Sequence, residues 1–155
     1  MLIGVGCPVA GAWATPASVA RFATLSERLG YHSAWTFQRL LVGAGQELDP
    51  VYRSVLDPLL TLTYAAAHTS RIRLGVAVVN LPFVSPTYLA KQAGTLDVLS
   101  GGRLDLGLGT GWSDVEFTAT GARTARRAAR TEEYLQVLKT LWTDQVSAYA
   151  GEFYT

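Results

Sequence analysis

The chain has 155 residues, of which 49% are hydrophobic and 16% are charged, a composition typical of a folded domain with a core. A net charge of +1 argues against nucleic acid or an anionic membrane as a partner. One cysteine, Cys7, and two histidines, His32 and His68, exclude the usual disulfide and His/Cys metal patterns. These counts predict no metal site. The sequence shows no basic leader and no apolar run of ~18 residues, and it therefore predicts a cytoplasmic protein.

Four times along the chain, a short apolar run is followed by a longer segment with a period near 3.6, an order that predicts parallel strands connected by helices. The expected strands are residues 3–7, 33–37, 72–79 and 104–108. Three helices begin with an N-cap residue followed by proline, at Thr15-Pro16, Asp57-Pro58 and Ser85-Pro86. Gly30 ends the first of these helices, and Gly101-Gly102 ends the third.

The last helix follows a glycine-rich turn at residues 107–111. Its expected buried stripe consists of Leu135, Leu138, Leu141 and Trp142. Residues 146–154 are expected to add a short strand or hairpin. We therefore expect one α/β domain over residues 1–155, with four strand–helix units.

Periodicity does not choose between a closed barrel and an open, doubly wound nucleotide-binding sheet. The glycine-rich turn gives one hint. In doubly wound folds the phosphate-binding glycines follow the first strand, whereas here they follow the fourth.

Longer motifs are more specific. Residues 89–112, with the sequence LAKQAGTLDVLSGGRLDLGLGTGW, resemble the signature of the luciferase-like, flavin- or F420-dependent oxidoreductases. Residues 34–39, 69–86, 130–135 and 151–154 resemble other parts of the same family. The resemblance implies parallel (β/α) units that form the first half of a TIM (β/α)8 barrel, with the chain truncated after the fourth unit. It also implies coenzyme F420, or alternatively FMN, at the carboxyl ends of the strands, and a small organic substrate.

The resemblance also implies the site residues. In the family the third strand often carries a non-proline cis peptide behind the cofactor ring, and the motif puts this bond between Ala77 and Val78. The other expected cofactor-binding residues are Asn80, Gly109, Thr110 and Gly111. Two tryptophans, Trp35 and Trp112, are expected to contact substrate.

Gln38 and Arg39 stand where many relatives carry an acidic residue and a histidine that act near the reactive carbon of the ring. Arginine stays protonated at any working pH, so Arg39 is not an ordinary general base. We expect it to bind an anionic substrate or the negative charge of the reduced ring, and Gln38 to orient groups by hydrogen bonding. The departure weakens the expectation of activity.

A half-barrel leaves two open sheet edges and, as we expect it, an apolar inner face. The sequence therefore predicts a homo-oligomer or a complementing chain. The rival interpretation is a non-catalytic half-barrel that acts as an assembly module.

Overall fold

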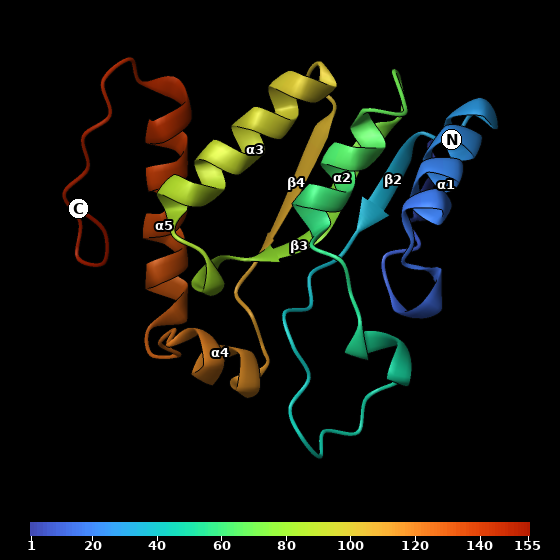
Figure 1. The fold of residues 1–155 in the computed structure, drawn as a ribbon. Helices are drawn as coiled ribbons and strands as arrows, with labels where there is room; N and C mark the ends of the chain where they lie inside the picture. The colour runs from blue at the N-terminus through green and yellow to red at the C-terminus, as the bar shows by residue number, and fades with distance from the viewer.

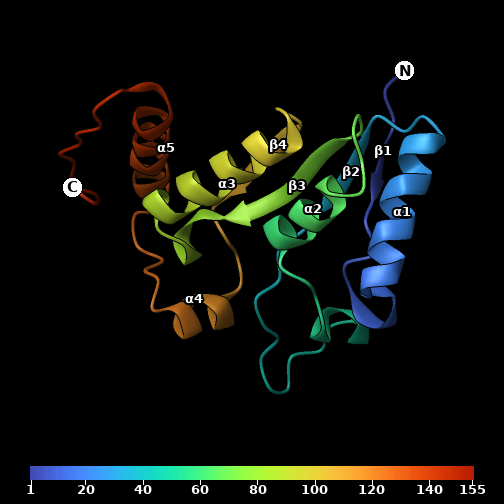
Figure 2. The same cartoon turned by 45° about the horizontal axis from the view of Figure 1, so that its top comes forward.

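The computed structural model describes residues 1–155 and contains a single sheet of four parallel strands in the order β1-β2-β3-β4. Each strand therefore lies beside its neighbour in sequence (Figures 1 and 2). A doubly wound sheet reverses its strand order, so this alternative was wrong and the barrel arrangement is confirmed. The strands are β1 (Gly4–Gly6), β2 (Ser33–Thr36), β3 (Arg73–Asn80) and β4 (Leu104–Gly109).

The helices begin where the caps predict. Thr15, Asp57 and Ser85 each accept a hydrogen bond from the backbone N–H three residues later, and a proline follows each of them. None of the helices is long and apolar enough to cross a membrane. They are α1 (Pro16–Arg28), α2 (Pro58–Ala66), α3 (Pro86–Ser100), α4 (Asp114–Thr120) and α5 (Arg127–Thr143), and a short 3₁₀ helix covers Leu81–Phe83.

Helices α1, α2 and α3 lie on the same face of the sheet (Figures 1 and 2). Leu74 and Val76 of β3 point to this face, and they belong to one buried cluster with Leu62 of α2 and with Leu89 and Leu96 of α3. Burial of such apolar side chains is the main stabilising contribution to the fold. The opposite face is the concave face of the half-barrel.

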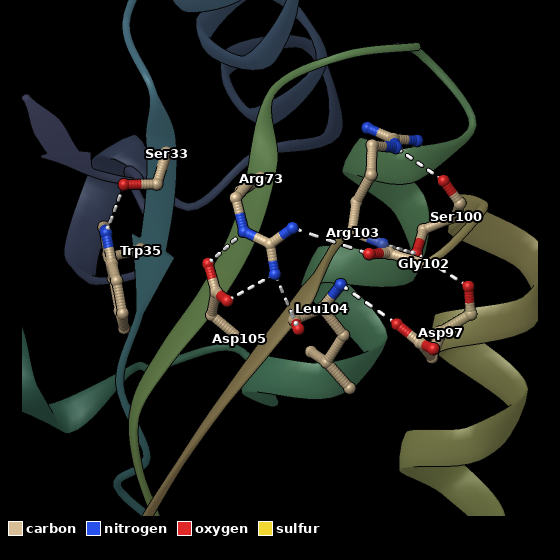
Figure 3. A network of polar contacts seen from close by, with 9 residues as sticks. All are labelled: Ser33, Trp35, Arg73, Asp97, Ser100, Gly102, Arg103, Leu104 and Asp105. Atoms are coloured by element: carbon tan, nitrogen blue, oxygen red, sulfur yellow. Dashed lines mark hydrogen bonds and ion pairs between the residues drawn. The ribbon is translucent and has the colours of Figure 1, made fainter. Parts of the chain in front are cut away.

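The concave face is not apolar, and that expectation was wrong. Arg73 of β3 forms two hydrogen bonds to the carboxylate of Asp105 on β4, at 2.7 and 2.5 Å (Figure 3). The Trp35 ring lies over Gly75, where an added Cβ would come within 2.4 Å of the ring, and its Nε1 donates to Ser33 Oγ at 2.8 Å. Side chains alternate between the two faces of a strand. In the first half of β3, only the even-numbered residues, Leu74 and Val76, therefore face the helices.

Arg103 is buried, with 8% of its surface exposed, and it connects α2, α3 and the segment before β3 (Figure 3). Its guanidinium donates to the carbonyl oxygens of Ser100 and Ala66, the last residues of α3 and α2. It also donates to the Ile72 carbonyl, before β3, and to Thr69. A single cation thus satisfies the carboxyl ends of two helices.

The C-terminal part differs from expectation. On α5 the buried residues are Tyr134, Val137 and Leu138, whereas Leu135 and Trp142 are 43% and 48% exposed. The helix packs obliquely, mainly against α3 (Figure 1), so its contact stripe is shifted and narrower than the leucine pattern suggests.

Residues 146–154 form no strand or hairpin, so this expectation was also wrong. The segment is held instead by the Glu133 carboxylate. It accepts hydrogen bonds from three consecutive backbone N–H groups, those of Glu152, Phe153 and Tyr154. Backbone donors that bind a side chain are not available to a strand ladder.

Glu27 of α1 forms a similar cradle before β3. Its carboxylate accepts from the backbone N–H groups of Ser70, Arg71 and Ile72, at 3.0, 2.5 and 2.8 Å. Burial alone would raise the pKa of Glu27, but the three donors together hold the pKa below its ordinary 4.5. The carboxylate therefore links α1 to the start of β3 in its charged form.

This cradle predicts an acid-sensitive contribution to stability. Since the pKa of Glu27 is lower in the folded state than in the unfolded state, the contribution is complete above about pH 4.5 and is lost as the pH falls through the folded value. We expect Glu27→Gln to lower the free energy of unfolding at pH 7 and to flatten its decline below pH 4.5. Urea unfolding at a series of pH values measures both effects; parallel curves for the two proteins would contradict the prediction.

Candidate cofactor site

The ladder between β3 and β4 is irregular near its carboxyl end. Val76 pairs with Leu106 and Val79 with Leu108, so that Ala77 and Val78 together oppose Gly107. The Ala77–Val78 peptide bond is cis, which confirms that part of the expectation. Ala77 is exposed at this point. Its small side chain thus faces outward where the family resemblance places a cofactor ring.

Two glycines let the strands approach closely here. A Cβ added at Gly107 would lie 2.3 Å from the carbonyl oxygen of Val76, and one added at Gly109 would lie 2.5 Å from Cγ2 of Val78. Neither position has room for a side chain. We call the surface formed by Ala77, Val78, Gly107 and Gly109 the main-chain wall.

Gln38 and Asn80 come together beside this wall, next to its member Gly109. The Asn80 backbone N–H donates to Oε1 of Gln38 at 2.8 Å, which fixes the loop after β2 against the end of β3. Asn80 is also the ladder partner of Gly109. Thr110, the next residue, is exposed. The structure thus gathers these predicted residues, while their contact with a cofactor stays a prediction.

Gly111 has a positive φ of 72° and lies against the rings of Phe83 and Phe117, so a residue with a side chain is strained there. Its carbonyl oxygen accepts a hydrogen bond from Arg127 of α5 at 3.0 Å. Gly111 therefore shapes the turn from β4 to α4. Its expected role in cofactor binding is untested.

Arg39 lies among groups that the sequence did not associate with it. Its Nη1 is 3.5 Å from Oε1 of Glu116 on α4, and its Cζ is 4.7 Å from the centroid of the Trp112 ring. The same Glu116 oxygen accepts the Leu40 backbone N–H at 2.8 Å. We call Arg39, Trp112 and Glu116 the arginine cluster.

Sequence reasoning missed Glu116, although its side chain is only 2% exposed. It follows Asp114 in a short helix, where acidic residues ordinarily lie in solvent. The sequence contains no signal for its burial, because its partners, Arg39 and Leu40, lie 77 and 76 residues earlier in the chain. Figure 1 shows why they meet: the loop after β2 and helix α4 extend from the same end of the sheet.

The remaining candidates are separated. Trp35 lies on the concave face within β2, whereas Trp112 is 61% exposed on the loop before α4.

Burial raises the pKa of the Cys7 thiol to about 12, so Cys7 remains a neutral thiol and is not a nucleophile at neutral pH. No group of three His, Cys, Asp or Glu side chains is arranged to hold a metal ion.

The structure as described is a set of parallel βα units in barrel order, with a cis peptide and a glycine-lined wall at the carboxyl ends of its strands. Such an arrangement defines the class of (β/α) barrels that bind ligands at this end. The sequence model of the luciferase-like monooxygenases matches residues 3–155. The chain belongs to this family.

Curated relatives include cofactor-dependent enzymes of two kinds. The FMNH2-dependent dimethylsulfone monooxygenase of Pseudomonas putida is 32% identical over 138 residues, which cover 86% of this chain and 36% of the relative. The F420-dependent glucose-6-phosphate dehydrogenase of Kineococcus radiotolerans is 33% identical over 143 residues, which cover 90% and 41%.

Among solved structures, the monooxygenase RslO1 from Streptomyces bottropensis superimposes with a TM-score of 0.83 at 29% identity, over 99% of this chain and 46% of RslO1. This chain thus spans less than half the length of the relatives it matches.

Proposed function

We propose that the chain forms the cofactor-binding half of an oxidoreductase that transfers a hydride between F420, or alternatively FMN, and a small organic molecule. The main-chain wall is the observation that carries this proposal. Family membership supports the class of reaction, and relatives of both cofactor types support the pair of candidates.

The wall fits the shape of a flat tricyclic ring. Gly107 and Gly109 have no side chains, Ala77 presents only a methyl group, and the compact side chain of Val78 lies close over the two glycines, so that a planar ring meets no long side chain. When bound, the ring would supply the hydride, since such chemistry belongs to the cofactor. The residues of the chain would bind the ring and orient the substrate.

In the mechanism that we propose, Asn80 and Gln38 position the loop after β2 relative to the ring. The amide oxygen of Gln38 accepts the Asn80 N–H, so its amide nitrogen remains available as a donor. Arg39 remains charged, so it holds a fixed positive charge and transfers no proton. A proton required by the reaction would therefore come from water or from a residue other than Gln38 and Arg39.

The wall predicts a clear effect of blocking it. We expect Ala77→Trp to weaken binding of F420 or FMN by at least about tenfold, because the indole fills the space in front of the wall. Fluorescence titration of the purified protein with each cofactor measures the dissociation constants and also decides between the two. Wild-type protein that binds neither cofactor would contradict the proposed function.

Ala17→Trp is the matched control. Ala17 is an exposed alanine in the first turn of α1, on the outside of the fold, and the same indole there should leave both affinities unchanged. If both variants lose binding equally, the effect of Ala77→Trp is a general one and the wall is not the site.

A non-catalytic module is the second candidate function. It is favoured by Gln38 and Arg39, because neither side chain performs the proton transfer expected of an acid–histidine pair. Cofactor binding without turnover of any substrate would support it.

We also propose that the chain associates with a second copy or with a complementing chain. Strands β1 and β4 each have one ladder partner, so their outer edges are unpaired. The Arg73–Asp105 pair on the concave face, whose side chains are 34% exposed, would then contact polar groups of the partner. Mass measurement in solution by light scattering tests this, and a monomer at micromolar concentration would overturn it.

A further inference from the structure

Two polar atoms of the arginine cluster, both on Arg39, are buried without a hydrogen-bond partner. Four buried side-chain nitrogen or oxygen atoms in the whole chain lack a hydrogen-bond partner. Three of them are Nε and Nη1 of Arg39 and Oγ of Ser113, the residue after Trp112. Buried donors without acceptors are costly, and they occur in native proteins chiefly where function requires them.

The Arg39 guanidinium is held in place without being fully bonded. Trp112 stacks on it. Oε1 of Glu116 lies 3.5 Å from Nη1, near enough to balance the charge of the guanidinium but too far for a good hydrogen bond. The side chain is 12% exposed, so part of it reaches the surface of the protein. A planar cation that is fixed by stacking loses little entropy when it binds a ligand.

Glu116 has a second task that explains why it does not bond more closely to Arg39. Its Oε1 accepts the Leu40 N–H at 2.8 Å, directly beside Arg39 in sequence. The carboxylate thus fixes the backbone that carries the arginine while it lowers the cost of burying the charge. Glu116 is a positioning residue in this arrangement.

We propose that the arginine cluster is a recognition site for an oxyanion, a carboxylate, sulfonate or phosphate group, carried by the substrate or by the cofactor. The proposal rests on the proposed function for its place beside the main-chain wall. Arg39 supplies the charge and the donors, and Trp112 supplies an exposed apolar surface for the body of the ligand. Substrates would therefore be anions.

Benzoate and benzamide are suitable probes, because they share shape and differ in charge. Calorimetric titration of the purified protein without cofactor is expected to show benzoate binding at least about tenfold more tightly than benzamide. Arg39→Gln should abolish this preference, and Arg39→Lys, which keeps the charge, should retain part of it. Equal binding of the two probes to wild type, or an unchanged preference in Arg39→Gln, overturns the proposal.

Glu116→Gln separates recognition from a structural ion pair. The amide oxygen still accepts the Leu40 N–H, but the carboxylate that competes for Arg39 is gone, so benzoate should bind several-fold more tightly. Weaker benzoate binding in this variant, with circular dichroism unchanged, would overturn the proposal. Arg28→Gln is the matched control, since it removes one positive charge from the end of α1, and it should behave as wild type.

The source of the oxyanion is decided by repeating the titration with reduced F420 or FMN at saturation. Benzoate that is displaced assigns Arg39 to the cofactor, whereas benzoate that binds alongside assigns it to the substrate. Because the first titration contains no cofactor, its result is independent of whether the proposed function is correct.

Discussion

Replacement of Arg103 by methionine is expected to lower the free energy of unfolding by about 3 kcal/mol or more. Methionine preserves much of the volume and removes every donor. The carbonyl oxygens of Ala66, Ser100 and Ile72 would then be left without the partner that satisfies them. Arg103→Lys, which keeps the charge with fewer donors, should lie between the two proteins. Urea unfolding monitored by circular dichroism measures the loss.

Arg28→Met provides the comparison for this prediction. Arg28 lies exposed in the last turn of α1, where a basic side chain interacts only with the end of the helix. Its replacement should cost less than about 0.5 kcal/mol. If Arg103→Met falls within the same range, Arg103 is not the link between α2, α3 and β3 that its contacts indicate.

Gly107→Ala is expected to destabilise the sheet by about 2 kcal/mol or more and to impair the cofactor site at the same time. The added methyl group would lie 2.3 Å from the carbonyl oxygen of Val76. That oxygen belongs to the backbone of β3, so it moves only if the ladder between β3 and β4 shifts. Thermal unfolding and cofactor titration of the same variant give the two readouts.

Gly6→Ala is the control, on the strand at the opposite edge of the sheet. Gly6 ends β1, its φ is not positive, and an added Cβ would have no neighbour within 4 Å. The substitution should be neutral or slightly stabilising, because alanine restricts the unfolded chain. Equal losses in both variants would show that glycine is required in these strands for a reason other than the contact with Val76.

The sequence predicts the parts of the fold that depend on neighbours in the chain. The starts of α1, α2 and α3 follow from a cap residue and a proline, and the end of α3 follows from Gly101, which adopts the left-handed conformation with φ at 72°. These signals are local, so no tertiary contact overrides them. The cis bond at Ala77–Val78 was instead found through resemblance, because composition and periodicity carry no information about it.

The features that sequence reasoning missed depend on distant partners. Glu116 is buried because α4 folds back beside the loop after β2, and residues 146–154 remain irregular because Glu133 occupies their N–H groups. The polar concave face was missed for a related reason. An apolar run such as that in β3 does not reveal which of its members face the helices until the neighbouring strands are placed.

The main-chain wall also bears on how the family can diversify. Its shape is set by backbone atoms and by the absence of side chains at Gly107 and Gly109, so few single substitutions are able to alter it without disturbing the sheet. The segments that follow β2 and β4, residues 37–57 and 110–126, are loops and short helices, which ordinarily tolerate more substitution than strands do. A surface built largely from backbone and framed by such loops would allow one mode of cofactor binding to serve many substrates, and attempts to redirect this protein toward a new substrate should begin in those two segments.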